Sequence, residues 1–202
     1  MTRPLILAST SKYRAELLAR LRFPFETRSP SVEEEIAPDE PASAAAARLA
    51  RAKAEAVAAG TDAVVIGADQ IPSLDGRILR KPGHHRAALE QLEACRGRSV
   101  VFHTAATVVD GRDGSTWSTV DVTEVDFARL DSEALDRYLA IEQPYDCAGG
   151  FKAEGLGIIL FSAIRSADPT ALIGLPMIWV AATLRRVGLD PLAPGRAPAE
   201  RP

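Results

Sequence analysis

The first sixty residues alternate between short apolar runs and segments with helical spacing. Leu5–Ala8 is a run of four apolar residues that predicts a buried strand, and apolar positions then recur at helical spacing from Tyr13 to Leu21. Phe23 starts a second extended piece. A strand, a helix and another strand in this order are typical of an α/β protein.

The next segments continue this alternation. Ser29–Glu40 is polar and acidic and predicts a loop, whereas the alanine-rich stretch Pro41–Ala59 predicts a long helix that ends at Gly60. Ala63–Gly67 predicts a buried strand, which we expect to end at Ala68-Asp69-Gln70. The Asp-Gly pair inside Leu74–Ile78 is typical of a tight hairpin.

Long strands dominate the middle of the chain. After a predicted helix at Pro82–Cys95, Ser99–Val109 and Ser115–Phe127 predict two antiparallel strands around a glycine-containing turn. In the second of these strands the apolar alternation slips by one residue, which predicts a β-bulge near Thr123.

The rest of the chain contains two further helices and a glycine-rich loop. Asp131 is placed as the N-cap of a helix that should end before Pro144, and Cys147–Gly157 is a glycine-dense loop leading to a predicted strand at Ile158–Phe161. A final helix is predicted from Pro176, in the first helical position, to a cap at Gly188. We expect 1–190 to form one domain and 191–202, rich in Pro and Ala, to be a disordered tail.

Composition narrows the class of ligand. The chain of 202 residues has a net charge of -3 and a pI near 5.7, which argues against a broad nucleic-acid surface and favours a local cationic site for a small anion. No apolar run is long enough to span a bilayer, so we expect a cytoplasmic protein without a membrane partner. Cys95 and Cys147 have no metal-ligand spacing, and we interpret the three histidines, including His84 and His85, as structural.

The candidate chemistry lies at strand ends. Ser9, Thr10 and Ser11 follow the first strand and open a helix that carries Arg14, and the unpaired N–H groups of a helix start favour phosphate. Asp69 at the end of a later strand suggests metal-assisted chemistry on a phosphate ester, with Lys81 as a further cation. Each feature alone is more often an ordinary cap, turn or surface charge. The signatures of serine hydrolases, P-loop NTPases and dinucleotide oxidoreductases are absent from the sequence.

Six short motifs occur in register with one known family. They are Leu5-Ile6-Leu7-Ala8-Ser9-Thr10-Ser11 with Arg14, Val32-Glu33-Glu34, Lys53 in an alanine-rich helix, Gly67-Ala68-Asp69-Gln70, Lys81-Pro82, and Phe151-Lys152-Ala153-Glu154-Gly155. From about Leu5 to Pro191 the chain resembles the Maf family of nucleotide pyrophosphatases. This resemblance implies an α/β fold of the Maf/ITPase type, with a mixed elongated central sheet flanked by helices and two lobes with a cleft between them.

The resemblance also implies roles for single residues. Asp69 matches the family's proton acceptor, and Ser9, Arg14, Lys53 and Lys81 match its phosphate-binding positions. Glu34 matches an acidic-loop glutamate that would hold a divalent metal, Mg or Mn, together with Asp69, although Glu33 or Glu35 could face the site instead. Tyr13, Gln70 and Glu154 most resemble the YceF subgroup, which is associated with 7-methyl-GTP, and would set specificity.

Two positions depart from the family pattern. Lys12 stands where proline is usual, which leaves the conformation of the loop open, and Ala15 stands where a second arginine is common. In the glycine-rich loop, Lys152 and Glu154 could simply form a salt bridge with each other.

The expected function is metal-dependent hydrolysis of a nucleoside triphosphate, with 7-methyl-GTP as the substrate, to the monophosphate and pyrophosphate. The alternatives are a pyrophosphatase acting on dTTP or UTP, and a non-catalytic nucleotide-binding regulator of cell division. The expected partner is the nucleotide, with no nucleic acid, and a homodimer is left open.

Overall fold

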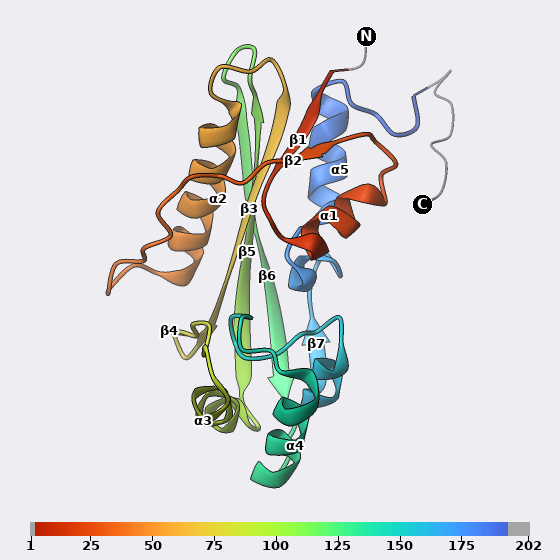
Figure 1. Cartoon of the computed structure of the whole chain (residues 1–202). Helices are drawn as coiled ribbons and strands as arrows, with labels where there is room; N and C mark the ends of the chain where they lie inside the picture. Colours follow the sequence, from red (N-terminus) through yellow and green to blue (C-terminus); the bar gives the residue numbers. More distant parts are fainter. Residues whose placement is uncertain (1–2, 194–202) are drawn as a thin grey trace.

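A seven-stranded mixed sheet forms the centre of the computed structural model, which describes residues 3–193 (Figure 1). The strand order is β2-β1-β3-β5-β6-β7, with β4 paired to β3. The strands are β1 (Leu5–Ala8), β2 (Glu26–Thr27), β3 (Val64–Leu74), β4 (Arg77–Ile78), β5 (Ser99–Asp110), β6 (Thr116–Phe127) and β7 (Phe161–Arg165). The α-helices are α1 (Lys12–Ala19), α2 (Ala42–Ala58), α3 (His85–Cys95), α4 (Ser132–Glu142) and α5 (Met177–Arg186), and the 3-10 helices are η1 (Leu156–Leu160) and η2 (Ala171–Ile173).

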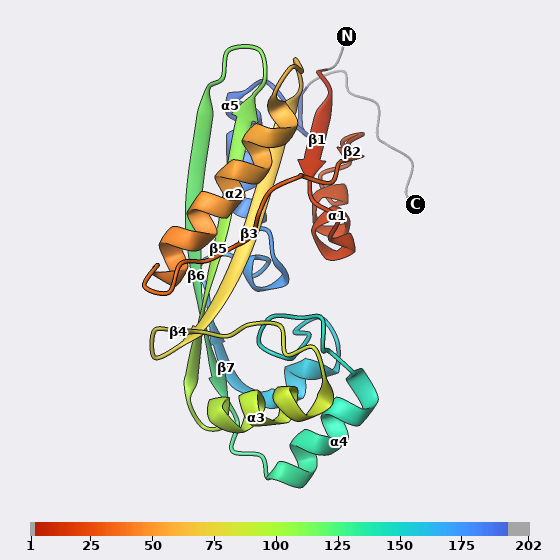
Figure 2. The ribbon, with the colours of Figure 1, turned by 60° about the vertical axis from the view of Figure 1, so that its left-hand side comes forward.

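The sheet is elongated because β3, β5 and β6 run through both halves of the molecule. β1 pairs in parallel with β2 and β3, whereas β3, β5, β6 and β7 pair antiparallel. In Figure 2 the upper half carries β1, α1, α2 and α5, and the lower half carries α3 and α4. The predicted α/β class with a mixed, elongated sheet and two lobes is confirmed.

Each lobe has its own apolar core. In the upper lobe, Leu17, Leu18 and Val180 pack with Ile66 on one face of the sheet, while the alanines of α2 cover the opposite face. The lower lobe is built around α3, α4 and four phenylalanine rings in edge-to-face contact, at centroid distances of 5.1 to 5.5 Å. The two cores therefore fix the lobes at opposite ends of the same three strands.

Strand β3 does not end at Asp69, as the sequence predicted, but continues to Leu74. It pairs with β5 along its whole length, from Val64 opposite Asp110 to Leu74 opposite Val100. Pro72 is tolerated because its carbonyl accepts from Leu79 N on the side away from β5, so its missing N–H falls outside the β3–β5 ladder. Asp69 thus lies in the middle of a strand.

The β-bulge predicted near Thr123 is also wrong. β5 and β6 keep one continuous register from Ser99 opposite Asp126 to Val109 opposite Thr116. The apolar positions change face because different helices cover the two ends of the sheet: Val120 packs toward α2, whereas Val125 packs into the lower-lobe core. The irregularity lies instead between β6 and β7, at Asp126 and Phe127.

Several element boundaries differ from those predicted. The helix expected from Pro82 begins only at His85, because His84 acts as its N-cap and accepts from Ala87 N. The strand expected at Ile158–Phe161 is the 3-10 helix η1, and the strand follows it as β7. Pro176 is the N-cap of α5 and not its first residue. The second extended piece is the short strand β2, which lies after the predicted start at Phe23.

The predicted helix N-cap at Asp131 and the hairpin at Leu74–Ile78 are confirmed. Asp131 accepts from Ala134 N at 2.8 Å, and α4 ends before Pro144. Asp75 and Gly76 both have positive φ, as a tight two-residue turn between β3 and β4 requires.

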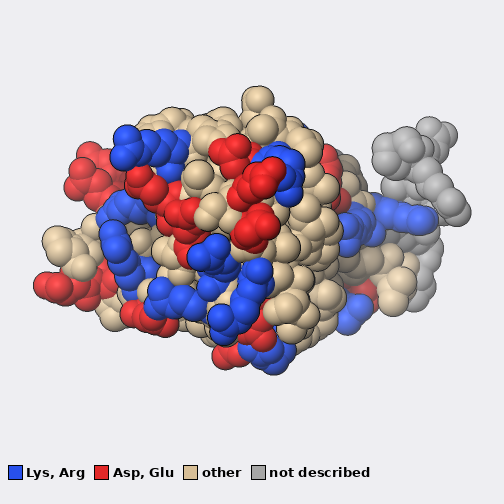
Figure 3. All heavy atoms as spheres, turned by 90° about the horizontal axis from the view of Figure 1, so that it is seen from below, with Lys and Arg blue, Asp and Glu red and all other residues tan. Residues whose placement is uncertain are grey.

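The predicted disordered tail falls mostly on residues 194–202, which lie outside the described residues. None of the helices in the described part of the chain is long and apolar enough to cross a membrane. On the face at the α3 and α4 end, Lys and Arg are interspersed with Asp and Glu (Figure 3).

Candidate active site

A cavity of about 900 Å³ lies between the two lobes, beside the point where β1 ends. Its lining comes from the β1–α1 loop, the acidic loop, α2, β3, the end of η2, and segments of the lower lobe. All nine site residues predicted from the sequence line it: Ser9, Tyr13, Arg14, Glu34, Lys53, Asp69, Gln70, Lys81 and Glu154. The structure therefore brings together in space the residues that lie far apart in the chain, and the predicted cleft is present.

The β1–α1 loop presents hydroxyl groups and backbone donors at a helix start. Ser11 is the N-cap of α1, and its side chain accepts from Arg14 N at 3.4 Å. The loop thus contains an ordinary helix cap next to the predicted ligand-binding residues. Ser9 is buried, and its Oγ accepts from Ser11 N at 3.1 Å and from Arg14 NH1 at 3.4 Å. This loop is the part of the cavity best suited to an anion.

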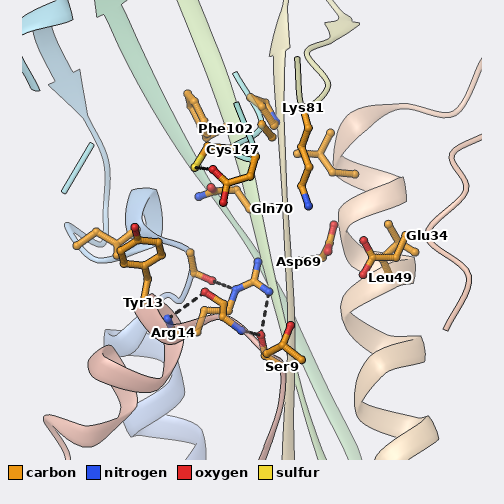
Figure 4. A pocket seen from close by; sticks show the side chains of 18 of the residues that line it. Ser9, Tyr13, Arg14, Glu34, Leu49, Asp69, Gln70, Lys81, Phe102 and Cys147 are labelled. Atoms are coloured by element: carbon orange, nitrogen blue, oxygen red, sulfur yellow. Dashed lines mark hydrogen bonds between the residues drawn. The ribbon is translucent and has the colours of Figure 1, made fainter. Parts of the chain in front are cut away.

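Arg14 is held rigidly against this loop. Its Nε donates to Gly174 O and its NH1 donates to Ala68 O, both at 2.9 Å. Burial lowers the pKa of the Arg14 guanidinium, and the nearby carboxylates of Asp69 and Glu34 oppose that shift. NH2 has no hydrogen-bond partner among the described residues, so it is the nitrogen left for a ligand (Figure 4).

Lys53 joins the two predicted acidic residues. Its ammonium comes from α2 and lies 2.7 Å from Asp69 Oδ1 and 2.6 Å from Glu34 Oε1. The Lys53 side chain is only 7% exposed and that of Asp69 is 11% exposed. Its hydrogen bond to Glu34 is the main cause that lowers the pKa of that carboxyl group. Charge is therefore concentrated at one point of the cavity wall.

Glu34, and neither of its acidic neighbours, lines the cavity. Glu33 is not among the residues that line the cavity, and Glu35 lines a separate hollow beside Arg48, so the structure favours Glu34 over its two neighbours. In Figure 4 the Lys81 side chain, from the segment after β4, points toward Asp69 from the lower lobe. Cations from both lobes thus face the same carboxylate.

Gln70 lies beside Asp69 in the strand but points to the opposite face of the sheet. Its Nε2 donates to Thr104 Oγ1 and to the carbonyls of Ala171 and Leu172, at 2.9 to 3.0 Å. Because the amide hydrogens are used inside the protein, only its carbonyl oxygen remains for a ligand. The role in specificity that the resemblance implies for Gln70 would therefore depend on accepting a hydrogen bond from the base.

Tyr13 lines the cavity close to a cation of its own helix. Lys12 Nζ lies 4.9 Å from the centre of the Tyr13 ring, within the range of a cation–π contact. Lys12 is the first residue of α1, a position where proline is favoured. The helix starts there although lysine stands in place of the proline that is usual in the family. Ala15, in place of the second arginine, packs against the upper-lobe core.

The glycine-rich loop forms the lower wall of the cavity. Glu154 is exposed at the rim, and Lys152 pairs with Glu142 of α4 at 3.7 Å, so the suggested salt bridge between Lys152 and Glu154 does not form. Sequence reasoning missed Asp146 and Cys147, which also line the cavity and contact each other at 3.5 Å. Their only sequence signal is their position at the start of the glycine-dense segment. His84 and His85 do not line the cavity.

The donor set suits a divalent cation that arrives with an anionic substrate. Among the described residues, no group of three or more His, Cys, Asp or Glu is placed to hold a metal alone. Asp69 and Glu34 nevertheless converge on a single cationic nitrogen. Mg²⁺ typically takes one or two protein carboxylates and completes its shell with phosphate oxygens and water, so these two residues fit it.

A family model described as "Maf-like protein" matches residues 4–187. The chain belongs to the Maf family. This confirms the resemblance seen in the sequence over nearly the same span. Relatives of this Maf protein include a "7-methyl-GTP pyrophosphatase" of Ralstonia nicotianae, which is 52% identical over 188 residues that cover 93% of this chain and 97% of that protein.

Other relatives of the Maf protein bear the same name. The "7-methyl-GTP pyrophosphatase" of Cupriavidus metallidurans is 50% identical over 189 residues, covering 93% of this chain and 95% of that protein. Among solved structures, the Ham1 protein of Staphylococcus aureus is similar with a TM-score of 0.46 and 18% identity, covering 63% of this chain and 73% of that chain.

Proposed function

We propose that this Maf protein is a nucleoside triphosphate pyrophosphatase that hydrolyses 7-methyl-GTP to the monophosphate and pyrophosphate. The observation that carries the proposal is the convergence of Arg14, Lys53 and Lys81 with Asp69 and Glu34 in one cavity of a Maf chain. Relatives about half identical over nearly the whole chain bear this activity in their names. A triphosphate is a concentrated anion, and these three cations are the groups that would neutralise its oxygens.

The chemical step is attack of water on the α-phosphorus. A new P–O bond forms at the α-phosphorus, the bond between the α-phosphorus and the oxygen that bridges to the β-phosphate breaks, and pyrophosphate leaves with this oxygen and the electron pair of the broken bond. Asp69 is the proposed acceptor of the water proton. Lys53 engages Oδ1 of Asp69, and Oδ2 has no hydrogen-bond partner among the described residues, so Oδ2 is the oxygen that would take the proton.

Cations around the triphosphate would fix it for this step. Ser9 and Arg14 would hold it at the start of α1, and Lys81 would approach from the lower lobe. A divalent cation, Mg²⁺ or Mn²⁺, held by Glu34 and Asp69 would lower the pKa of the attacking water and neutralise phosphate charge. Fixing the phosphates from both lobes also orients the α-phosphorus toward Asp69.

Recognition of the base is proposed to depend on charge. Methylation at N7 makes guanine cationic, and an aromatic face together with a carboxylate favours such a ring; Tyr13 and Glu154 would supply these. The carbonyl of Gln70 would accept a hydrogen bond from the base edge. Lys12 already places a positive charge over Tyr13, so a cationic base must either displace it or use the other face of the ring.

The test is a panel of 7-methyl-GTP, GTP, dTTP and UTP, assayed for pyrophosphate release with Mg²⁺ and with Mn²⁺. We expect the highest kcat/KM for 7-methyl-GTP. A ratio to GTP at or below one would reject the substrate assignment, and a preference for dTTP or UTP would favour the broader pyrophosphatase. If no nucleotide releases pyrophosphate, the result would favour the alternative of a non-catalytic nucleotide-binding regulator.

Two variants test the charge argument with the same pair of substrates. Glu154→Gln should reduce the preference for 7-methyl-GTP over GTP, because it removes the carboxylate but keeps the shape of the side chain. Lys12→Met should increase the preference, because it removes the cation that competes for the Tyr13 ring. Equal ratios in both variants and the wild type would contradict recognition by charge.

A further inference from the structure

The acidic loop, residues 29–40, carries Glu34 to the cavity but is weakly tied to the rest of the fold. Its backbone hydrogen bond from Glu40 N to Ala37 O, 3.1 Å long, closes a turn within the loop itself. The Glu34 side chain is 58% exposed, and the contact that fixes it is the ion pair with Lys53. For the position of Glu34 to be well defined, the loop needs contacts with the rest of the fold in addition to the Glu34–Lys53 ion pair.

Arg48 of α2 provides three hydrogen bonds to this loop. Its Nε donates to Glu40 Oε1 at 2.8 Å and its NH2 donates to Glu40 Oε2 at 2.7 Å, which is the two-pronged geometry that makes arginine–carboxylate pairs strong. The same NH2 donates to Glu35 O at 2.8 Å, and Glu35 directly follows Glu34. The guanidinium therefore holds both the end of the loop and the peptide next to the proposed metal ligand.

Glu40 links this anchor to the shape of the loop. Its Oε2 also accepts from Ala37 N at 3.4 Å, so one carboxylate closes the turn and binds Arg48. The Glu40 side chain is 17% exposed, whereas that of Arg48 is 46% exposed. Ile36 packs against α2 as well, which adds an apolar contact but does not orient a peptide group.

We propose that Arg48 is a positioning residue of the active site, which acts through Glu35 and Glu40 to hold Glu34 beside Lys53 and so sets the affinity for the divalent cation. This inference rests on the proposed function in one respect, the role of Glu34 as a metal ligand. Arg48 lies outside the main cavity and forms no hydrogen bond with Asp69, but its charge acts on the Asp69 carboxylate through space. Arg48→Lys keeps this charge, so a loss of metal affinity in Arg48→Lys and in Glu40→Gln reports on the loop and not on the charge of Arg48. Residues that orient metal ligands typically change metal affinity by about 10-fold to 100-fold when replaced.

The experiment compares six variants with the wild type: three single variants of the anchor, one control on the same helix, the double variant Arg48→Gln/Glu40→Gln, and Glu34→Gln. Arg48→Gln and Glu40→Gln remove the anchor from its two sides, and Arg48→Lys keeps the charge without the two-pronged geometry. The matched control is Arg51→Gln on the same helix, where an exposed arginine pairs with Glu55 and does not reach the loop. Thermal unfolding of each variant verifies that it is folded.

Two readouts do not require turnover. One is hydrogen–deuterium exchange of the peptide that covers residues 29–40, and the other is binding of Mn²⁺, followed by electron paramagnetic resonance, with a non-hydrolysable α,β-methylene analogue of the nucleotide. We expect faster exchange and Mn²⁺ binding weakened about 10-fold in Arg48→Gln and Glu40→Gln, a smaller effect in Arg48→Lys, and wild-type values in Arg51→Gln. The double variant Arg48→Gln/Glu40→Gln should lose less affinity than the two single variants added together, because both single variants break the shared Arg48–Glu40 contact, while the Arg48–Glu35 and Ala37–Glu40 contacts each depend on one residue.

Wild-type Mn²⁺ binding in Arg48→Gln would overturn the inference, even if its loop exchanged faster, because the anchor would then be structural only. Glu34→Gln separates the proposed positioning role of Arg48 from the proposed role of Glu34 as a metal ligand. If Glu34→Gln weakens Mn²⁺ binding and Arg48→Gln does not, the positioning role is wrong. If Glu34→Gln binds Mn²⁺ as the wild type does, the assignment of Glu34 in the proposed function is wrong and the inference falls with it.

Discussion

Replacing Lys53 by Met is the sharpest test of how the site is held together. Met has nearly the length of Lys and keeps the apolar contacts of its stem, but it removes the ammonium that binds Asp69 and Glu34. The variant therefore leaves two carboxylates at one point of the cavity wall, one of them largely buried. We expect lower stability at neutral pH, a loss of stability that shrinks in acid, and loss of pyrophosphate release.

The size of the effect follows from the geometry. Both carboxylate oxygens lie within 2.7 Å of one nitrogen, so they are at most roughly 5 Å apart, and at an effective dielectric constant of about 20 their repulsion is about 3 kcal/mol. Solvent reduces this value because the Glu34 side chain is 58% exposed. The larger contribution comes from breaking the buried Lys53–Asp69 pair, for which about 3 kcal/mol is typical. The screened repulsion adds to this value, so we expect the free energy of unfolding to fall by about 4 kcal/mol in total.

The dependence on pH has a defined sign. Because the pKa of Glu34 is lowered in the fold, its ionised form stabilises the protein above the ordinary value of 4.5, and this stabilisation is lost as the pH falls through the lowered pKa. The variant lacks this contribution, so the difference between wild type and variant should be fully present at pH 7 and should decrease below pH 4.5. Urea unfolding at several pH values measures it.

A control on the same helix separates this effect from a general loss of charge. Arg51→Met removes an exposed cation that pairs with Glu55 one turn away, which should change stability by about 0.5 kcal/mol or less. If Lys53→Met were as stable as Arg51→Met at pH 7, Lys53 would not neutralise the two carboxylates, and its ion pairs with Asp69 and Glu34 would not hold the site together.

Three further predictions concern β3. Asp69→Asn should lower turnover by roughly 10²-fold to 10⁴-fold in a pyrophosphate-release assay while the protein stays folded, and near wild-type turnover at saturating metal would reject Asp69 as the proton acceptor. Gln70→Leu should lower the free energy of unfolding by about 1 to 3 kcal/mol, because the Leu172 carbonyl loses the donor Gln70 and the Ala171 carbonyl keeps only Thr104; an unchanged urea midpoint would contradict this. Gly67→Ala should destabilise the fold by roughly 1 to 3 kcal/mol or more, since its Cβ would lie 2.3 Å from Ala50 O in α2, and a calorimetric scan that matches the wild type would show that the helix can move away freely.

Much of the architecture was predictable because local signals and tertiary packing agree. Three elements could be predicted from their own residue patterns. They are the strand at Leu5–Ala8, the alanine-rich helix before Gly60, and the pair of long strands around the turn after Asp110. The site residues were predictable for another reason: their motifs match a family. The residue types alone left ordinary caps and surface charges as the more frequent alternatives.

The errors arose where packing from elsewhere in the chain overrides the local pattern. Polar residues at 69 and 70 suggested the end of a strand, but pairing with β5 continues β3 to Leu74. The slip of apolar positions around Thr123 suggested a bulge, but it reflects helices that cover opposite faces of one regular strand. The sequence of a strand does not show which strand pairs with it or which helix covers it, although both determine where the strand ends and which of its faces is buried.

The extra length of β3 explains how this strand links the two lobes at the site. β1 ends at Ala8, opposite Gly67, so beyond that pair the edge of β3 is open to the cavity. Successive side chains of a strand point to opposite faces, and here Asp69 reaches Lys53 of α2 on one face while Gln70 reaches η2 on the other. A strand that stopped at residue 69 would present only the carboxylate. By running on into the lower lobe, β3 leads the chain through the β4 turn to Lys81, and this is how a cation from the second lobe comes to face the carboxylate held by the first.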